Sequence, residues 1–438
     1  MSQRLMVWMN GIHVGVWEIT RQGERFTYAE SWLNNAQARP LSLSLPFTPG
    51  NAPYQGPLVA HYFDNLLPDS DAIRRRLAQR YQAQGIDAFH LLQRIGRDCV
   101  GAIQLLPEGE EPTDVDQIQA RSLNEAEVAD QLRRVSTNAA LGHDPLDDLR
   151  LSIAGAQEKT ALLRYRGRWC LPRGSTPTTH IFKLPLGLVG HRQADMRTSV
   201  ENEWLCSKIM AAYGVPIASC EIAQFQDQKA LIVERFDRQP SADKRWIMRL
   251  PQEDFCQAMG VSPLQKYQAD GGPSITSCMK LLLGSANKDQ DRLHFFKTQL
   301  LFWLLAATDG HAKNFSIAHL PGGVYRATPI YDVLSAHPVL GSGKNKIPSQ
   351  KAKLAMAVRG ATNHYLIDTI QKRHWISQGE QVGLGADMTN ALIEEVVDQT
   401  ESAIERVSQL VPTGFPLDLA DAIFQGMRKQ RARLADNR

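Results

Sequence analysis

The stretch that decides the fold reads Ala307-Thr308-Asp309-Gly310-His311-Ala312-Lys313-Asn314-Phe315, and Pro329-Ile330-Tyr331-Asp332 follows it. Asn314 stands five residues after Asp309, and Asp332 stands eighteen residues after Asn314. Phosphoryl transfer from ATP needs a carboxylate that orients and deprotonates a hydroxyl, an Asn five residues later that holds one Mg²⁺, and a second Asp that holds the other. This spacing predicts Asp309 as the catalytic base and Asn314 and Asp332 as metal ligands.

The residues on either side of the trio favour the same interpretation. Apolar residues at helical spacing predict a buried helix that ends near Asp309; they are Phe296, Leu300, Trp303, Leu304 and Ala307. Residues 315–320 and 324–330 flank Pro321-Gly322-Gly323, which predicts a hairpin that folds Asp332 back toward Asn314. Taken singly, Asp309 could equally cap a helix end, and Asp332 could occupy an ordinary turn.

Composition sets wide bounds on the class of protein. A chain of 438 residues predicts two or three domains with full-sized cores. Its 43% hydrophobic and 22% charged residues are typical of a globular protein, and its apolar runs are too short to cross a bilayer. With no secretory leader and six scattered cysteines, we expect a cytoplasmic protein with reduced thiols and no membrane partner. The net charge of +3 does not by itself require a nucleic-acid partner.

The first third of the chain predicts strands and then a helix. Asn10-Gly11 lies between β-prone residues 5–9 and 12–17, a strong hairpin signal. Residues 41–45 alternate Leu and Ser, which predicts a half-buried strand. Residues 107–119 are acidic and predict a surface connection, after which Ser122 and Glu125 have the spacing of a helix capping box.

The remaining chain completes an α+β fold. Short strands dominate residues 149–236, with one helix near 200–213, whereas helices dominate from about residue 252. We therefore expect a strand-rich N-terminal lobe and a helical C-terminal lobe. The expected domains are an N-terminal β-rich part (1–106), a connection and helix (107–148), a nucleotide-binding part (149–251) and a helical catalytic part that could also face DNA (252–438).

Residues 151–183 supply a candidate phosphate site. Residues 151–162 read as strand, small-residue turn and strand, and Ala154, Gly155 and Ala156 would let backbone N–H groups approach phosphate oxygens. No P-loop or dinucleotide pattern is present, so the segment could also be a plain turn. Lys183 lies in an apolar strand, where its charge requires an anion such as a phosphate or a helix carboxylate, unless the side chain reaches solvent at the strand end.

Several blocks along the chain resemble the HipA family of bacterial serine/threonine kinase toxins. The blocks are Phe63-Asp64-Asn65-Leu66-Leu67-Pro68-Asp69-Ser70, residues 152–160, Ile181-Phe182-Lys183-Leu184-Pro185, Glu234-Arg235-Phe236-Asp237-Arg238, residues 308–315 and Tyr331-Asp332. The resemblance runs nearly end to end. It implies a two-lobed, protein-kinase-like fold that uses ATP and Mg²⁺, protein substrates such as glutamyl-tRNA synthetase, and a DNA-binding HipB-type antitoxin dimer as partner. Such a protein would be nucleoid-associated when bound to its antitoxin on operator DNA.

The resemblance also implies roles for individual residues. Asp309 would be the base, Asn314 and Asp332 the metal ligands, and Ser152 a site of autophosphorylation. The implied nucleotide-binding residues are Ala154, Gly155, Ala156, Gln157, Glu158, Lys159, Lys183, Glu234, Arg235, Phe236, His311, Lys313, Asn314 and Tyr331.

Some features depart from the pattern or leave alternatives open. Asp309 lies in Asp-Gly-His-Ala-Lys-Asn rather than in the His-Arg-Asp loop of eukaryotic-type kinases, and Asp332 is followed by Val333-Leu334. Lys372 and Arg373 match the family's DNA-contacting surface, whereas residues 341–361 are basic but resemble the family less and could be a solvated loop. A small-molecule kinase of the aminoglycoside or choline type, or a non-catalytic repressor subunit, stays an alternative.

Overall fold

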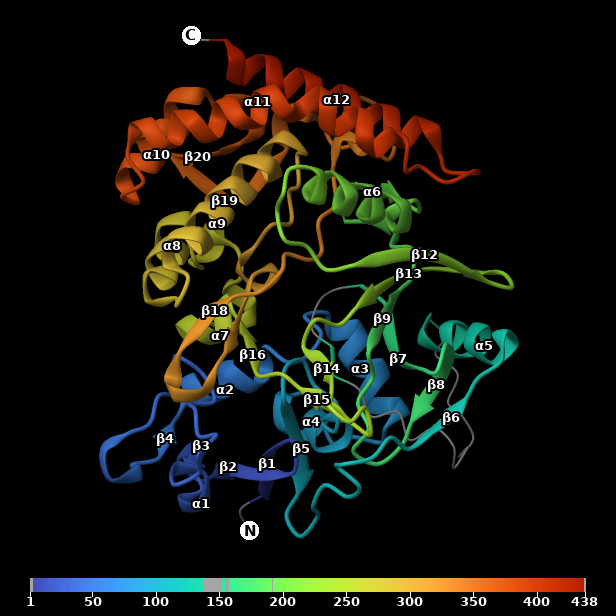
Figure 1. The fold of residues 1–438 in the computed structure, drawn as a ribbon, viewed down its shortest axis with the longest axis vertical. Coiled ribbons are helices and arrows are strands. Elements are labelled where there is room, and N and C mark those ends of the chain that lie inside the picture. Colours follow the sequence, from blue (N-terminus) through green and yellow to red (C-terminus); the bar gives the residue numbers. More distant parts are fainter. Residues whose placement is uncertain (1–2, 137–151, 154–156, 191, 437–438) are drawn as a thin grey trace. The chain divides into compact units, whose positions relative to one another are not determined.

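The computed structural model describes residues 3–136, 152–153, 157–190 and 192–436 (Figure 1). The chain divides into two compact units. The first unit contains Met1–Leu184, Ala223–Leu264 and Ile317–Tyr325, and the second contains Pro185–Ile222, Gln265–Ser316 and Arg326–Arg438. The expected α+β class is confirmed, because strands dominate the N-terminal part and helices dominate the C-terminal end. The four expected domain ranges stay a prediction.

A five-stranded sheet opens the first unit. Its order is β4 (Tyr54–Gln55), β3 (Gly23–Tyr28), β2 (Ile12–Thr20), β1 (Gln3–Met9), β5 (Ile103–Pro107). The accompanying helices are α1 (Glu30–Leu33), α2 (Pro57–Asp64), α3 (Asp71–Arg80) and α4 (Ala88–Ile95). The predicted turn between β1 and β2 is confirmed, with Asn10 at φ 48° and Gly11 at φ 81°. Both residue types tolerate positive φ, which is why this dipeptide favours a tight hairpin.

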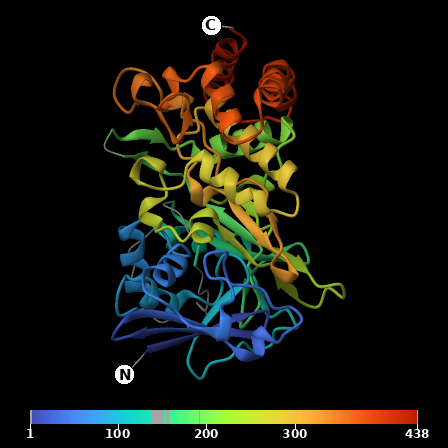
Figure 2. The same ribbon diagram turned by 90° about the vertical axis from the view of Figure 1, so that its left-hand side faces the viewer.

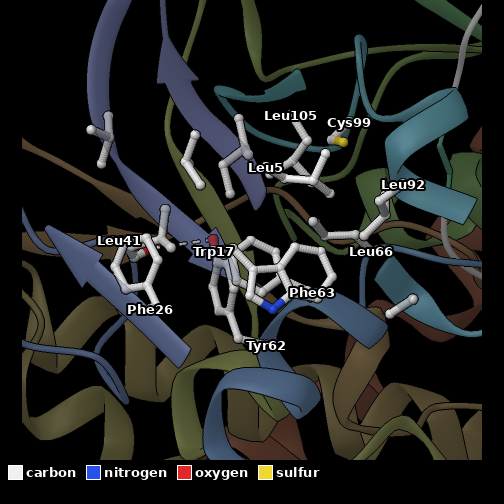
Figure 3. Packing of buried hydrophobic residues seen from close by; sticks show 14 of the residues in the cluster. Leu5, Trp17, Phe26, Leu41, Tyr62, Phe63, Leu66, Leu92, Cys99 and Leu105 are labelled. Carbon is white, nitrogen blue, oxygen red and sulfur yellow. Dashed lines mark hydrogen bonds between the residues drawn. The ribbon is translucent and has the colours of Figure 1, made fainter. Parts of the chain in front are cut away.

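Aromatic packing joins this sheet to its helices. Trp17 on β2 stacks on Phe63 of α2 with ring centroids 3.9 Å apart (Figure 3). Phe89 of α4 meets Trp17 edge-on at 4.9 Å. The Trp17 indole N–H is satisfied by the Glu24 carboxylate at 2.9 Å. Large aromatic side chains dominate core energetics, and a buried indole needs an acceptor. The N-terminal sheet and helices α2 and α4 therefore share a hydrophobic core.

The strand expected at residues 41–45 is wrong. The segment folds into a turn in which the Leu45 N–H donates to the Ser42 carbonyl at 3.1 Å. The Ser42 hydroxyl accepts from the Ser44 backbone at 3.0 Å, and the Leu43 N–H donates to Glu253 Oε1 at 2.8 Å. Short hydroxyl side chains offer the backbone local partners that compete with a sheet, and alternation alone does not reveal that competition.

A six-stranded sheet follows, in the order β12 (Cys220–Phe225), β13 (Gln228–Glu234), β9 (His180–Lys183), β7 (Lys159–Tyr165), β8 (Arg168–Pro172), β6 (Ala120–Ser122). Helix α5 (Glu125–Ser136) packs against it through Val128, Ala129 and Leu132. The capping box differs from the predicted pair: Asn124 accepts from the Glu127 N–H, and Glu127 accepts from the Asn124 N–H, both at 2.9 Å. Asn124 and Glu127 satisfy the same three-residue spacing and are good capping types.

Shorter elements complete the first unit and begin the second. They are β14 (Arg238–Pro240), β15 (Ile247–Arg249), β16 (Gln252–Asp254), α7 (Phe255–Met259), β10 (Gly187–Val189) and β11 (Ala194–Met196). Helix α7 begins with a complete capping box between Asp254 and Gln257. The side chains of all six cysteines are buried, and none of them forms a disulfide with another.

The second unit is mainly helical. Its elements include α6 (Ser199–Ala212), α8 (Ile275–Leu281), α9 (Lys288–Leu304), α10 (Lys372–Gln381), α11 (Ala386–Ser408), α12 (Leu417–Ala435), β19 (Lys353–Arg359) and β20 (Asn363–Leu366). Helices α11 and α12 run side by side, as Figure 2 also shows. The predicted helix before Asp309 is α9, which is buried along its last three turns. Among the described helices, none has an apolar stretch that could cross a membrane.

A buried ion network ties the N-terminal strands to the rest of the first unit. Asp98 Oδ1 lies 2.9 Å from Arg238 Nη2, and Asp237 Oδ2 lies 2.8 Å from Arg235 Nη2. Arg249 Nε approaches Asp98 at 3.5 Å, and all five side chains are buried. Burial acts to raise the pKa of Asp98, but the three guanidinium groups hold that pKa well below its usual range. Burial lowers the pKa of Arg249 to about 10.

Removing the charge of Asp98 should destabilise the first unit strongly. An Asp98→Asn chain would leave three buried guanidinium groups against one carboxylate, and such a loss costs about 3–5 kcal/mol. Because folding lowers the pKa of Asp98, its contribution is complete above about pH 4 and is lost as the pH falls toward the folded pKa. Urea unfolding at neutral pH should therefore show a lower free energy of unfolding for Asp98→Asn than for the wild type. This difference should shrink only in strong acid. Asp243→Asn, which removes an exposed ion pair with Arg245, is the control and should leave the midpoint unchanged.

Candidate active site

The candidate catalytic loop in the second unit follows α9 directly. The Asp309 carbonyl accepts two hydrogen bonds, from the His311 N–H at 2.8 Å and from Asn314 Nδ2 at 2.8 Å. The Asn314 N–H in turn donates to the His311 carbonyl at 3.0 Å, which closes the short 3₁₀ turn Ala312–Asn314. Asn314 is buried, whereas the side chain of Asp309 is 59% exposed. The loop therefore presents one accessible carboxylate on a rigid backbone, as a general base requires.

Gly310 is required where it stands. A Cβ at this position would lie 2.3 Å from Cδ2 of Phe302, whose ring packs into the core beside Phe315. Only glycine lets the backbone pass this close to an aromatic ring. Packing therefore explains why glycine follows Asp309 in the motif. The close approach of the backbone to Phe302 places Asp309 at the surface, beyond the apolar end of α9.

The hairpin expected between Asn314 and Asp332 is confirmed. It consists of β17 (Ser316–His319), the turn Pro321–Gly323 and β18 (Tyr325–Ala327), and the Thr328 N–H donates to the Ser316 carbonyl at 3.0 Å. The Tyr331 hydroxyl bonds to the Lys313 carbonyl at 3.0 Å and to the Ser316 hydroxyl at 2.5 Å. These bonds hold the Tyr331 side chain against residues 313–316, and Asp332 follows Tyr331 directly in the chain.

Asp332 has an unusual backbone conformation. Its φ is 64°, in the left-handed region that non-glycine residues seldom adopt. Such strain is maintained only where the surroundings fix it, and it gathers at functional sites. The next segment supplies that restraint: Asn202 of α6 exchanges two 2.8 Å hydrogen bonds with the backbone of Ser335, whose hydroxyl donates to the Leu305 carbonyl at 2.6 Å. Sequence reasoning missed Asn202, because a single amide in a helix that is buried on all sides carries no local signal.

The residues present fit a Mg²⁺ ion held together with a nucleotide. The amide nitrogen of Asn314 is used by the Asp309 carbonyl, which leaves its Oδ1 oxygen as the group for a cation. A carboxylate from Asp332 adds a second hard oxygen ligand, and Mg²⁺ is commonly bound by one or two such groups plus substrate phosphates. Among the described residues, no three His, Cys, Asp or Glu side chains gather into a metal-binding group. Phosphate oxygens would therefore have to complete the coordination.

The candidate nucleotide-binding strands belong to the first unit. Lys183 ends β9, is buried, and is paired across the sheet with Leu231 of β13 and with Lys159 of β7. Two lysines directly opposite each other repel, and an anion bound beside them offsets that repulsion. Lys159 is the first residue of β7, and Lys183 is the last residue of β9. This pairing, which the sequence did not reveal, agrees with a phosphate site.

The end of the expected phosphate loop is anchored. Gln157 Nε2 donates to the Leu184 carbonyl at 2.5 Å, the Leu184 N–H donates to the Glu158 carbonyl at 3.2 Å, and the Glu158 carboxylate pairs with Arg76 of α3. Ala154, Gly155 and Ala156 lie outside the described residues. Their predicted contact with phosphates stays a prediction.

Three of the residues expected to bind the nucleotide differ in what their side chains do. Glu234 ends β13 and is exposed, and Phe236 is half-buried. The Arg235 side chain is only 2% exposed and lies in the ion network with Asp98 and Asp237, while its N–H donates to the Thr179 carbonyl at 2.9 Å. The Arg235 guanidinium stabilises the ion network, so Arg235 could contact a nucleotide only through its backbone carbonyl oxygen.

Ser152 is fully buried in the first unit. Its hydroxyl donates to the Leu66 carbonyl at 2.8 Å, and its N–H donates to the Asp98 carbonyl at 3.1 Å. The hydroxyl thus has the hydrogen bond that a buried polar group needs. A serine in this state cannot be a phosphoryl acceptor until the segment leaves its place.

The residues expected to face DNA begin α10. Arg373 is exposed and Lys372 is half-buried, whereas His374 and Trp375 are buried. Lys372 and Arg373 are thus the members of this block whose side chains could reach a phosphate backbone. Within the basic segment 341–361, residues 353–359 form β19, so that part is not a loop.

Sequence reasoning also missed Tyr267. Its hydroxyl donates to Asp309 Oδ1, and its ring meets the His311 ring edge-on with centroids 5.0 Å apart. His311 Nε2 lies 3.8 Å from the same carboxylate oxygen. No local signal marks Tyr267, because it precedes Asp309 by 42 residues and lies just before the short 3₁₀ turn Gln268–Asp270 rather than in a motif.

Comparisons with known proteins identify the family of this chain. A family model described as the HipA N-terminal domain matches residues 5–106, and one described as the HipA-like C-terminal domain matches residues 151–404. The putative kinase Y4mE of Sinorhizobium fredii is 33% identical over 408 residues, which cover 92% of this chain and 91% of the relative. The serine/threonine-protein kinase toxin HipA of Shewanella oneidensis is 25% identical over 409 residues, 91% of this chain and 86% of the relative.

One solved structure has the same fold over nearly the whole chain. It is the complex of HipA, HipB and operator DNA from Shewanella oneidensis, with a TM-score of 0.78 and 22% identity, and the match covers 98% of this chain and 96% of that one.

Proposed function

Because the chain belongs to the HipA family, we propose that it is an ATP-dependent serine/threonine protein kinase acting as the toxin of a toxin–antitoxin module. The observation that carries this proposal is the loop at Asp309: its carboxylate is exposed, its own carbonyl orients Asn314, and the Tyr331 hydroxyl next to Asp332 in the chain bonds to the Lys313 carbonyl. In this proposal Asp309 takes the proton of the acceptor hydroxyl, and Asn314 and Asp332 hold Mg²⁺ at the nucleotide phosphates. Lys183 and Lys159, which are paired across the sheet of the first unit, are proposed to bind phosphate oxygens.

Incubation of the purified chain with ATP and Mg²⁺, followed by intact-protein mass measurement, tests the proposal without knowledge of a substrate. A gain of one phosphoryl group, located at Ser152 by peptide mapping, is the expected result. A chain that binds ATP but phosphorylates neither itself nor a general acceptor protein such as dephosphorylated casein would contradict it. Glutamyl-tRNA synthetase, the target that the family resemblance implies, is the first specific substrate to assay.

The proposed partner is a HipB-type antitoxin dimer bound to operator DNA in the cytoplasm. The Shewanella oneidensis relative was solved with HipB and operator DNA, and the present chain carries exposed Arg373 at the start of α10. In the proposed complex the antitoxin reads the bases, while Lys372 and Arg373 meet phosphates, contacts that fix position but carry no sequence information.

Arg373→Ala should weaken a ternary complex of chain, antitoxin and operator almost equally on matched and mismatched operators. Each lost phosphate contact releases one fewer counterion, so the slope of log K against log salt should fall by roughly one unit. Binding titrations at several salt concentrations measure both quantities. Arg197→Ala, which removes an exposed arginine paired with Asp195, is the control and should leave the slope unchanged. An unchanged slope together with lower kinase activity would assign Arg373 to substrate recognition instead.

A further inference from the structure

We propose that Tyr267 is a positioning residue for phosphoryl transfer: its hydroxyl holds the Asp309 carboxylate through Oδ1 and leaves Oδ2 to the acceptor hydroxyl. The inference rests on the proposed function, in which Asp309 is the general base. It assigns a task to a residue that lies outside every motif of the catalytic loop.

The half-buried Tyr267 ring contacts two neighbouring side chains. The His311 ring meets it edge-on at 84°, and the Lys266 ammonium lies 5.4 Å from its centroid. His311 is itself buried and belongs to the catalytic loop, so the phenol is placed relative to the same turn that carries Asp309. An aromatic ring has few rotatable bonds, and this packing restricts them further.

The backbone that carries Tyr267 is equally restrained. The Tyr267 carbonyl accepts from the N–H groups of Asp270 at 3.1 Å and Gly272 at 3.0 Å. A Cβ on Gly272 would lie 1.8 Å from the Gln265 carbonyl oxygen, so only glycine allows this tight loop.

Two further bonds attach the loop to its neighbours in the second unit. Gln268 Oε1 accepts from the Ala357 N–H of β19 at 2.8 Å, and the Lys266 carbonyl accepts from the Ala312 N–H at 3.4 Å. The second bond joins the Tyr267 loop directly to the catalytic loop. These hydrogen bonds therefore hold the backbone that carries the Tyr267 hydroxyl in place relative to Asp309.

A fixed donor matters because the Asp309 side chain is largely exposed. The loop fixes its backbone through the carbonyl, but rotation about the last side-chain bond is broad for an aspartate. An ionised carboxylate can accept about four hydrogen bonds, so a phenol on Oδ1 fixes the carboxylate plane and leaves Oδ2 available. During transfer the acceptor oxygen bonds to the γ-phosphorus, the bond from that phosphorus to the bridging oxygen breaks, ADP leaves, and the acceptor proton moves to Oδ2.

Tyr267→Phe keeps the ring and removes only the hydroxyl. Loss of a hydrogen bond to a charged group should lower kcat by about ten-fold to a hundred-fold, whereas the KM for ATP and the thermal midpoint should not change. The split between kcat and KM separates positioning from a structural role, because a distorted loop would change both. Steady-state assays use Ser152→Ala chains as enzyme, which cannot modify themselves at Ser152, and dephosphorylated casein as acceptor.

Two controls sharpen this experiment. Tyr54→Phe also removes one tyrosine hydroxyl, which donates to the Pro46 carbonyl at 2.6 Å in the first unit, and it should leave kcat unchanged. In an Asp309→Asn chain, Tyr267→Phe should cause no further loss of the residual rate, since the hydroxyl acts only through the base. An unchanged kcat, a rise in kcat that would show a masking contact, or matching changes in KM and thermal midpoint would each overturn the inference. If Ser152→Ala chains with Tyr267 intact phosphorylate nothing, the proposed function fails and the inference fails with it.

Discussion

Asp309→Asn should reduce phosphoryl transfer by about 10²–10⁴-fold while leaving the fold intact, because an amide cannot take the proton of the acceptor hydroxyl. The fold should survive, since the Asp309 side chain is largely exposed and its structural hydrogen bonds come from its backbone carbonyl. Nucleotide binding in the presence of Mg²⁺ should be unchanged in this variant. Radiolabelled ATP transfer and equilibrium nucleotide binding measure the two properties separately.

Asp332→Asn should lose transfer for a different reason. In the proposed site Asp332 holds the ion at the phosphates, so its loss should weaken Mg²⁺-dependent nucleotide binding as well. Asp398→Asn, an exposed carboxylate on α11, is the matched control and should retain full activity and binding. If the Asp309 variant keeps more than about a tenth of the wild-type rate, where a lost base predicts a far larger loss, the assignment of the base is wrong. Equal losses of nucleotide binding in both variants would mean that Asp309 also holds the ion.

Phosphorylation of Ser152 should abolish ATP binding and switch the kinase off. A phosphoserine carries a charge of about −1.5 to −2 and three acceptor oxygens. The buried position now occupied by the hydroxyl offers it the Leu66 carbonyl, an acceptor that would repel it. The modified residue should therefore leave its place, break the hydrogen bond from its N–H to Asp98, and displace the segment that leads to Gln157 and Lys159.

The measurement compares nucleotide affinity before and after modification. Wild-type protein that carries phosphate at Ser152 should lose ATP binding, whereas Ser152→Ala should bind ATP as well as unmodified wild type and never gain phosphate there. Because the product destroys its own donor site, modification should occur between molecules and be second order in protein. Normal ATP binding by protein phosphorylated at Ser152 would rule out the switch and leave the kinase assignment untouched.

The sequence alone determined the features whose cause is local. Helical spacing predicted α9, Asn10-Gly11 predicted the first hairpin, and Pro321-Gly322-Gly323 predicted the turn between β17 and β18. Each of these depends on a few neighbouring residues, whose dihedral preferences and apolar spacing are readable one segment at a time. The trio of Asp309, Asn314 and Asp332 was accessible for the same reason.

Hydrogen bonds and ion pairs between residues far apart in the sequence could be read only from the tertiary structure. Ser152 donates to a carbonyl 86 residues away, and Arg235 reaches a carboxylate 137 residues away. Residues 41–45 had the alternation of a strand, but the local bond of the Ser44 N–H to the Ser42 hydroxyl favours a turn, and the Leu43 N–H bonds to Glu253, 210 residues along the chain. Burial forces every polar group to find a hydrogen-bond partner, and that partner is chosen by how distant segments pack. The burial of Ser152, the structural role of Arg235 and the Tyr267 hydroxyl on Asp309 therefore emerge only once the chain has folded.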